Sequence, residues 1–250
     1  MAALTAGAAI VALGPALLRA GAALPLRFAS VKSLPMHSGA LTTTNASGRA
    51  GAFLLPAGYA SQRLPLMVAI HGTGGHGAAM IELFREAAQR ERFIVAAPDS
   101  RVGPEGQASW EVPDRPDATT DDLDHIRRCV DEVLAMPDVH VDFARTLIVG
   151  HAGGGSTAPY VASGIGLYRA FAVLHGGVVT ASLGDRRMRG WFSTGDADTV
   201  RPPRLVERAA EEMRHAGFGS VVSRVFHEGH DVGPAEVRAL VDWWLRGGST

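Results

Sequence analysis

The strongest constraint on the fold is the alternation of short apolar runs with longer segments of helical periodicity. Each apolar run is bounded by Gly, Pro or Asp and has the length of a buried strand. The predicted strands are 52–55, 66–70, 93–97, 146–149, 170–174, 190–193 and 221–226. The predicted helices are 78–90, 120–136, 154–163, 202–216 and 234–244. This alternation predicts an α/β domain in which helices cover both faces of a mostly parallel sheet, with any functional site at the carboxyl ends of the strands.

Composition narrows the class of partner. The 250 residues carry 24 basic and 25 acidic side chains, which gives a net charge of −1, and 46% of the residues are hydrophobic. Without a basic stripe we expect no nucleic-acid partner. The single cysteine, Cys129, cannot form an internal disulfide. No repeat or low-complexity linker divides the chain, so we expect one domain over residues 26–250.

Residues 1–25 differ from the rest of the chain. The stretch Ala2–Leu18 has no charged residue, and small residues follow Arg19 up to Ala23. This stretch resembles the apolar part of an export signal. Because it is shorter than a comfortable membrane span, we expect no lasting membrane anchor. Because no basic segment precedes it, two interpretations stay open: the remnant of an export signal, or an apolar helix packed on the domain. The first predicts a periplasmic or secreted protein and the second a cytoplasmic one.

A glycine-rich turn follows the predicted strand 146–149. The sequence Gly150-His151-Ala152-Gly153-Gly154 has the spacing of the G-x-S-x-G nucleophile elbow, in which a strained turn lifts one side chain above the sheet. Here alanine stands at the central position. A methyl group can neither attack a carbonyl nor transfer a proton, so the chain lacks the group that such a turn presents.

Two later strand ends carry the partners that a nucleophile needs. Asp196 and Asp198 follow the strand 190–193, and His227 and His230 follow the strand 221–226. The chain order is therefore elbow, acid, histidine. A fourth strand end, His71-Gly72-Thr73-Gly74-Gly75, is a glycine-rich loop suited to an oxyanion hole.

With these motifs the sequence resembles the α/β-hydrolase superfamily, and within it the serine esterases without a cap domain that are related to polyhydroxybutyrate depolymerases and feruloyl esterases. The resemblance runs over residues 50–246 and also rests on 54–59, 121–123 and 145–150. It implies that position 152 is the nucleophile site, Asp198 the acid and His230 the general base, with Asp196 and His227 as the weaker alternatives. It further implies oxyanion donors at the N–H of Gly153 and at that of Thr73 or Gly74.

The activity that the resemblance implies is carboxylic ester hydrolysis by a Ser-His-Asp triad, without cofactor or metal. Ala152 makes the chain inactive as written. We favour an engineered Ser→Ala variant that holds its substrate uncleaved, because acid, base, elbow and oxyanion loop are all present; natural loss of catalysis is the alternative. An amidase or peptidase with the same triad and a non-catalytic binding protein are the other interpretations.

Three further residues are candidates for binding a small or polymeric ester: His76, Trp110 and His151. Trp110 lies in the long segment 99–119, and His151 precedes the nucleophile position. Each of the three also has a structural interpretation as a packing residue. Ser156 is expected to be a helix-cap or packing hydroxyl rather than a displaced nucleophile. The short connection between 174 and 190 predicts that no cap domain covers the site.

Overall fold

The computed structural model describes residues 35–42, 49–103, 105–111, 120–177 and 185–247. All of them belong to one compact unit, Lys32–Thr250. The apolar segment 1–25 lies outside the described residues, so the predictions about it stay predictions. Within the described part of the chain, no helix is long and apolar enough to cross a bilayer.

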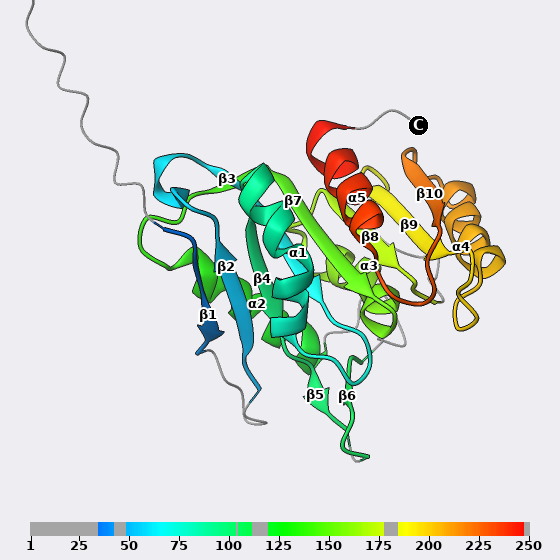
Figure 1. The fold of residues 1–250 in the computed structure, drawn as a ribbon, viewed down its shortest axis with the longest axis horizontal. Coiled ribbons are helices and arrows are strands. Elements are labelled where there is room, and N and C mark those ends of the chain that lie inside the picture. Colours follow the sequence, from blue (N-terminus) through cyan, green and yellow to red (C-terminus); the bar gives the residue numbers. More distant parts are fainter. Residues whose placement is uncertain (1–34, 43–48, 104, 112–119, 178–184, 248–250) are drawn as a thin grey trace, which may run out of the picture. The chain divides into compact units, whose positions relative to one another are not determined.

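An eight-stranded sheet forms the centre of the unit (Figure 1). Its strand order is β1-β2-β4-β3-β7-β8-β9-β10. Every neighbouring pair from β4 to β10 is parallel. At the other edge, β2 runs antiparallel to both of its neighbours, β1 and β4. The strands are β1 (His37–Leu41), β2 (Gly51–Leu55), β3 (Leu64–Ile70), β4 (Ile94–Pro98), β7 (Val141–His151), β8 (Ala170–Leu174), β9 (Arg189–Gly195) and β10 (Val221–Phe226). The predicted mostly parallel sheet is confirmed.

Helices cover both faces of this sheet (Figure 1). They are α1 (Gly77–Glu91), α2 (Asp121–Leu134), α3 (Gly153–Ile165), α4 (Pro203–His215) and α5 (Pro234–Arg246), with a short 3₁₀ turn, η1 (Tyr59–Ser61). Helices α1 and α5 share one buried apolar cluster, and α2, α3 and α4 share the other. The predicted layering is therefore correct, and the described residues contain no large cap over the strand ends.

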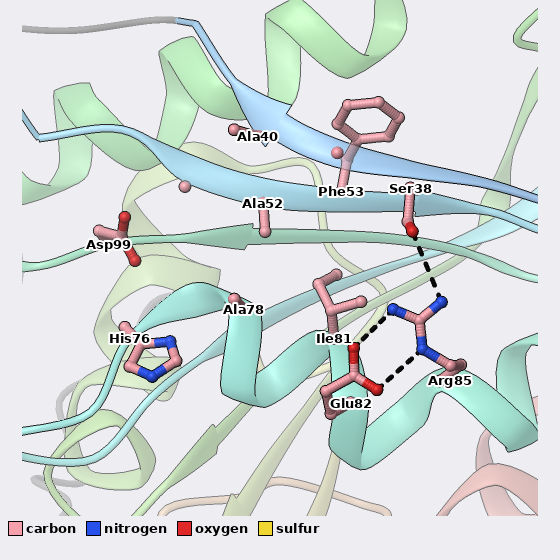
Figure 2. A pocket seen from close by; sticks show the side chains of 12 residues that line it. Ser38, Ala40, Ala52, Phe53, His76, Ala78, Ile81, Glu82, Arg85 and Asp99 are labelled. Carbon is pink, nitrogen blue, oxygen red and sulfur yellow. Dashed lines mark hydrogen bonds and ion pairs between the residues drawn. The ribbon is translucent and has the colours of Figure 1, made fainter.

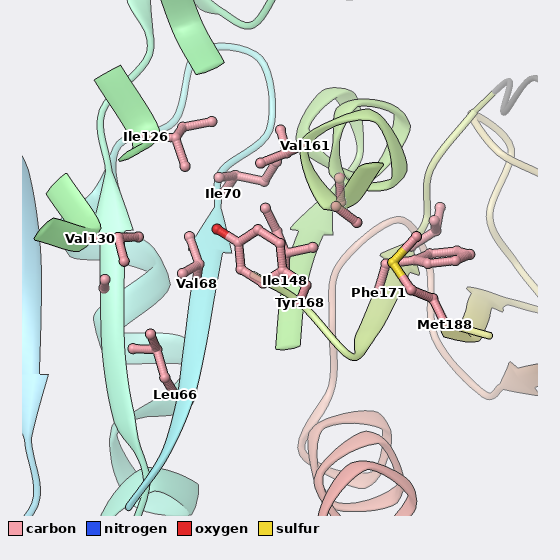
Figure 3. Close-up of a cluster of buried hydrophobic side chains, with 14 of the residues drawn as sticks. Leu66, Val68, Ile70, Ile126, Val130, Ile148, Val161, Tyr168, Phe171 and Met188 are labelled. Carbon is pink, nitrogen blue, oxygen red and sulfur yellow. The ribbon is translucent and has the colours of Figure 1, made fainter. Parts of the chain in front are cut away.

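The core is made where strand side chains alternate between the two faces. Figure 3 shows one cluster, in which Val68 of β3 and Ile148 of β7, which are register partners, pack with Ile126 and Val130 of α2. These strand side chains are fully buried, as expected for a central parallel sheet. Packing on both faces fixes the strand register, and with it the positions of the loops at the carboxyl ends.

Two features of the fold escaped the sequence patterns. Strand β1 has four exposed residues out of five, because it is an edge strand, so it carries no buried apolar run. The hairpin of β5 (Arg101–Val102) and β6 (Ala108–Ser109) has only two residues in each strand, too few for a periodicity to be read. Neither changes the layering, but the hairpin lies in the loop that follows β4 at the functional edge.

Candidate active site

The turn between β7 and α3 has the geometry of a nucleophile elbow. Ala152 has φ 49° and ψ −112°, a conformation that costs energy for a residue with a Cβ. Glycine is required on both sides: a Cβ on Gly150 would lie 2.1 Å from the carbonyl oxygen of Gly154, and a Cβ on Gly154 would lie 2.4 Å from that of His71. The close-packed backbone therefore holds the side chain of residue 152 in one direction.

Asp198 and His230 form a hydrogen-bonded pair at the same edge of the sheet. His230 donates from Nδ1 to Oδ2 of Asp198 at 2.9 Å, and Asp198 is only 3% exposed. The other carboxylate oxygen accepts the backbone N–H groups of Val200 at 2.8 Å and Arg201 at 2.7 Å. Burial would raise the pKa of Asp198, but these N–H donors and the histidines hold that pKa well below its usual range. Asp198 is thus an ionised acceptor that sets the orientation and tautomer of His230.

The alternative pair, Asp196 and His227, lies apart from this one. His227 Nδ1 is 2.5 Å from Oδ2 of Asp196, and the His227 side chain is fully exposed. The acid and histidine loops are joined through their backbones, because the N–H of Ala197 donates to the carbonyl of Glu228 at 3.1 Å. Of the two candidate pairs, the structure buries Asp198 with His230 and leaves Asp196 with His227 at the surface.

The glycine-rich loop after β3 lies against the elbow. A Cβ on Gly72 would lie 3.2 Å from Cβ of Ala152, and one on Gly153 would lie 2.9 Å from Oγ1 of Thr73. The N–H of Gly74, one of the predicted oxyanion donors, points elsewhere: it donates to the carbonyl of Ala108 at 2.7 Å. Among the described residues the N–H groups of Thr73 and Gly153 have no such acceptor, so these two are the donors that remain for an oxyanion. Gly153 opens α3, where N–H groups have no acceptor within the helix.

His71 and Trp110 hold this loop in place. His71 is buried; its Nδ1 donates to the carbonyl of Gly72 at 2.7 Å and its Nε2 accepts the N–H of Ser100 at 3.0 Å. Burial lowers the pKa of His71, in keeping with a neutral ring. Trp110 donates its indole N–H to the carbonyl of His71 at 2.8 Å and packs against the core. In this structure Trp110 is thus engaged in supporting the loop.

His151 and His76, the other two substrate-binding candidates, lie in different places. The Nε2 of His151 donates to the backbone carbonyl of His230 at 2.9 Å, which ties the histidine loop to the elbow. His76 caps α1, where its Nδ1 accepts the N–H of Ala79 at 3.2 Å. It lines a cavity of about 460 Å³ between α1 and the β1–β2 edge (Figure 2), whose lining does not include Ala152, Asp198 or His230.

Ser156, one turn into α3, is occupied as a packing hydroxyl. It accepts the N–H of Gly177 at 2.9 Å and its Oγ lies 3.4 Å from the carbonyl of Ala152. The hydroxyl therefore connects α3 to the loop that follows β8.

A buried histidine next to the acid was missed by the sequence reasoning. His175 donates from Nδ1 to Oδ2 of Asp198 at 2.8 Å, and its Nε2 lies 3.1 Å from Oε2 of Glu236. A sequence signal existed: His175 directly follows the buried strand 170–174, at the same sheet edge as the other site residues. Glu236 lies in the first turn of α5, where an acidic residue is typical of any helix, so it carried no distinct signal.

His175, Asp198 and His230 are also the described residues whose donor atoms are close enough to hold a metal ion, within 4.8 Å of one another. Their Nδ1–Oδ2 distances of 2.8 and 2.9 Å are those of N–H···O hydrogen bonds. A metal would have to replace the protons of both rings and would leave His230 without its orienting bond. The arrangement fits proton transfer better than metal binding.

Comparison of the sequence with protein-family models and with curated proteins finds no match. Solved structures do match. A carboxylesterase from Mesorhizobium loti aligns with a TM-score of 0.61 at 20% identity, over 84% of this chain and 99% of that one. The chain has the α/β-hydrolase fold.

Two further structures support this assignment of the fold. A carboxylesterase from Bacillus cereus has a TM-score of 0.56 at 16% identity, over 85% of this chain and 95% of that one. Acyl-protein thioesterase 2 from Zea mays has a TM-score of 0.55 at 18% identity, over 84% and 97%. In this α/β-hydrolase fold the elbow, acid and histidine loops occupy the carboxyl ends of β7, β9 and β10.

Proposed function

We propose that this chain is a carboxylic ester hydrolase of the Ser-His-Asp type in which alanine replaces the nucleophilic serine. The observation that carries the proposal is the backbone of Ala152, held at a positive φ between β7 and α3. Such strain is retained where a turn presents a reactive side chain. Two further observations support it: Asp198 is ionised and orients His230, and the N–H groups of Thr73 and Gly153 have no acceptor among the described residues.

The chemistry follows from these positions. A serine at position 152 attacks the acyl carbon while Nε2 of His230 removes its proton, and Asp198 stabilises the imidazolium that forms. The N–H groups of Gly153 and Thr73 stabilise the oxyanion. Collapse of this intermediate breaks the ester bond, and the alcohol leaves with the proton that His230 had taken up. The neutral His230 then activates the water that hydrolyses the acyl-enzyme. The structural neighbours named as esterases and thioesterases support an acyl-transfer reaction of this kind.

The test compares this chain with its Ala152→Ser variant on p-nitrophenyl acetate and butyrate. We expect turnover only in the serine form. Its kcat should exceed that of the alanine form by roughly 10⁶-fold, because removing the nucleophile from a comparable triad lowers kcat by that factor. Ala78→Ser, on the exposed side of α1, is the matched control and should remain inactive. If both the parent and Ala152→Ser are folded and neither turns over, the proposal is wrong and a binding protein of this fold is the better interpretation.

A parallel assay on a p-nitroanilide with the same acyl group separates the second enzyme class. Ester hydrolysis predicts that Ala152→Ser prefers the ester well beyond the intrinsic difference in reactivity between the two leaving groups. A preference for the anilide after that correction would identify an amidase or peptidase.

A further inference from the structure

His175 is a fully buried histidine in an unusual backbone conformation. It follows β8 directly and is 0% exposed. Its φ is 49°, the same positive value as that of Ala152, which also lies at a strand end. Its N–H donates to the carbonyl of Ser193 in β9 at 2.8 Å, and the N–H of Ala152 donates to the carbonyl of Leu174, just before it, at 2.9 Å. The strained position is thus fixed to the elbow and to the strand that leads to the acid.

Both ring nitrogens of His175 face carboxylates. Nδ1 lies 2.8 Å from Oδ2 of Asp198, and Nε2 lies 3.1 Å from Oε2 of Glu236; all three side chains are buried. An ionised carboxylate can only accept hydrogen bonds, so each of these contacts needs a proton on the ring. A ring with two protons carries a positive charge, which two buried carboxylates compensate.

The electrostatics agree with this geometry. Burial alone would lower the pKa of His175, but the hydrogen bonds and charges of Glu236 and Asp198 outweigh it and raise that pKa. The second oxygen of Glu236, Oε1, is buried and has no hydrogen-bond partner among the described residues. Among the described residues, the hydrogen bond to the carboxyl group of Glu236 therefore comes from His175.

The groups that face His175 include the catalytic pair. Besides Asp198 and Glu236, its ring is 5.6 Å from that of His230 and 5.8 Å from that of His151, centroid to centroid. His175 and His230 donate to the same oxygen of Asp198. This second donor restrains the carboxylate that orients His230.

We propose that His175 is a positioning residue of this site: a buried imidazolium, held by Glu236, that fixes the orientation of Asp198 and, through it, that of His230. The structural part concerns the chain as it stands. The catalytic part rests on the proposed hydrolase function.

The structural part is tested on the chain with alanine at position 152. Nitrogen-15 NMR of labelled histidine at pH 7.5 should show one imidazole with both nitrogens protonated and slow exchange with solvent. That signal should disappear in the double variant His175→Asn/Glu236→Gln, which keeps polar groups at both positions and avoids a stranded carboxylate. If the signal lost in the double variant is that of a neutral ring, the imidazolium assignment is wrong, whether or not the protein is an enzyme.

The catalytic part is tested by kcat and KM of the same double variant in the Ala152→Ser background, on p-nitrophenyl butyrate. Loss of the second donor to Oδ2 of Asp198 leaves that carboxylate free to turn away from His230, so kcat should fall about tenfold. KM should stay unchanged, because His175 is fully buried.

His227→Asn is the matched control, because it removes an exposed histidine that pairs with a different aspartate. Its kcat should stay unchanged. A folded double variant with an unchanged kcat would refute the positioning role, and the hydrolase proposal would survive, since Ala152→Ser would still turn over.

Discussion

At the residue scale, burial distinguishes two neighbouring aspartates that the sequence offers as the acid. Asp196 and Asp198 are two positions apart in one loop, yet Asp198 accepts two backbone N–H groups and two histidines, whereas Asp196 pairs with an exposed His227. The sequence favoured Asp198 and His230, and the structure places these two together. The Asp198 environment explains the direction of its pKa, because several donors stabilise its charged form.

This difference predicts the effect of amide substitutions in the Ala152→Ser background. Asp198→Asn should lower kcat by about 10⁴-fold, because an amide favours the wrong tautomer of His230. Asp196→Asn is the matched control and should lower kcat less than about threefold, as expected for an exposed pair. Steady-state kinetics on p-nitrophenyl butyrate measures both, and the opposite ranking would assign the acid to Asp196.

At the scale of the element, the strand-to-helix turn depends on backbone contacts that no side chain can enter. Helix α3 begins at Gly153, and its second residue, Gly154, lies under the loop that follows β3. The sequence predicted this turn from its glycine spacing, and the contacts give the reason for the spacing. Helix α2 begins differently, with a side-chain cap: Thr120 accepts the N–H of Leu123 at 3.2 Å.

We expect Gly154→Ala to lower the free energy of unfolding by about 1–3 kcal/mol, the usual cost of overpacking. Its new methyl would lie 2.4–2.5 Å from the carbonyl oxygens of His71 and Ile70, which are backbone atoms and cannot rotate away. Gly164→Ala, in the same helix but exposed, meets only the side chain of Leu123 at 3.3 Å and should be neutral or stabilising. Urea unfolding gives both values; equal effects would show that the elbow tolerates a side chain.

At the scale of the whole molecule, Cys129 reports on the integrity of the core. It is fully buried in α2, and burial raises the pKa of its thiol to about 12. Since the thiolate is the reactive form, the folded protein should resist a thiol reagent such as DTNB at pH 8. We expect labelling at least about 10³-fold slower than in urea-unfolded protein, in line with the stability of a domain of this size.

A second cysteine supplies the comparison. The Ser220→Cys variant places a thiol at an exposed position before β10. In the folded protein this thiol should react as fast as a thiol of the unfolded chain, while Cys129 in the same molecule stays protected. Rapid labelling of Cys129 under native conditions would show that α2 opens locally, without unfolding of the sheet.

The sequence by itself determined the helices α1 to α5, the strands of the main sheet other than β1, the glycine-rich turn at Ala152 and the loops that carry Asp198 and His230. These features repeat a local pattern of burial or require glycine at fixed spacing, so neighbouring residues encode them. Only the tertiary structure decided that Gly74 gives its N–H to Ala108 and that His175 and Glu236 join Asp198. Those contacts connect positions 23 to 61 residues apart, where strand ends and a helix converge. No periodicity along the chain records which polar side chains will share a buried hydrogen bond, because that depends on sheet order and helix docking.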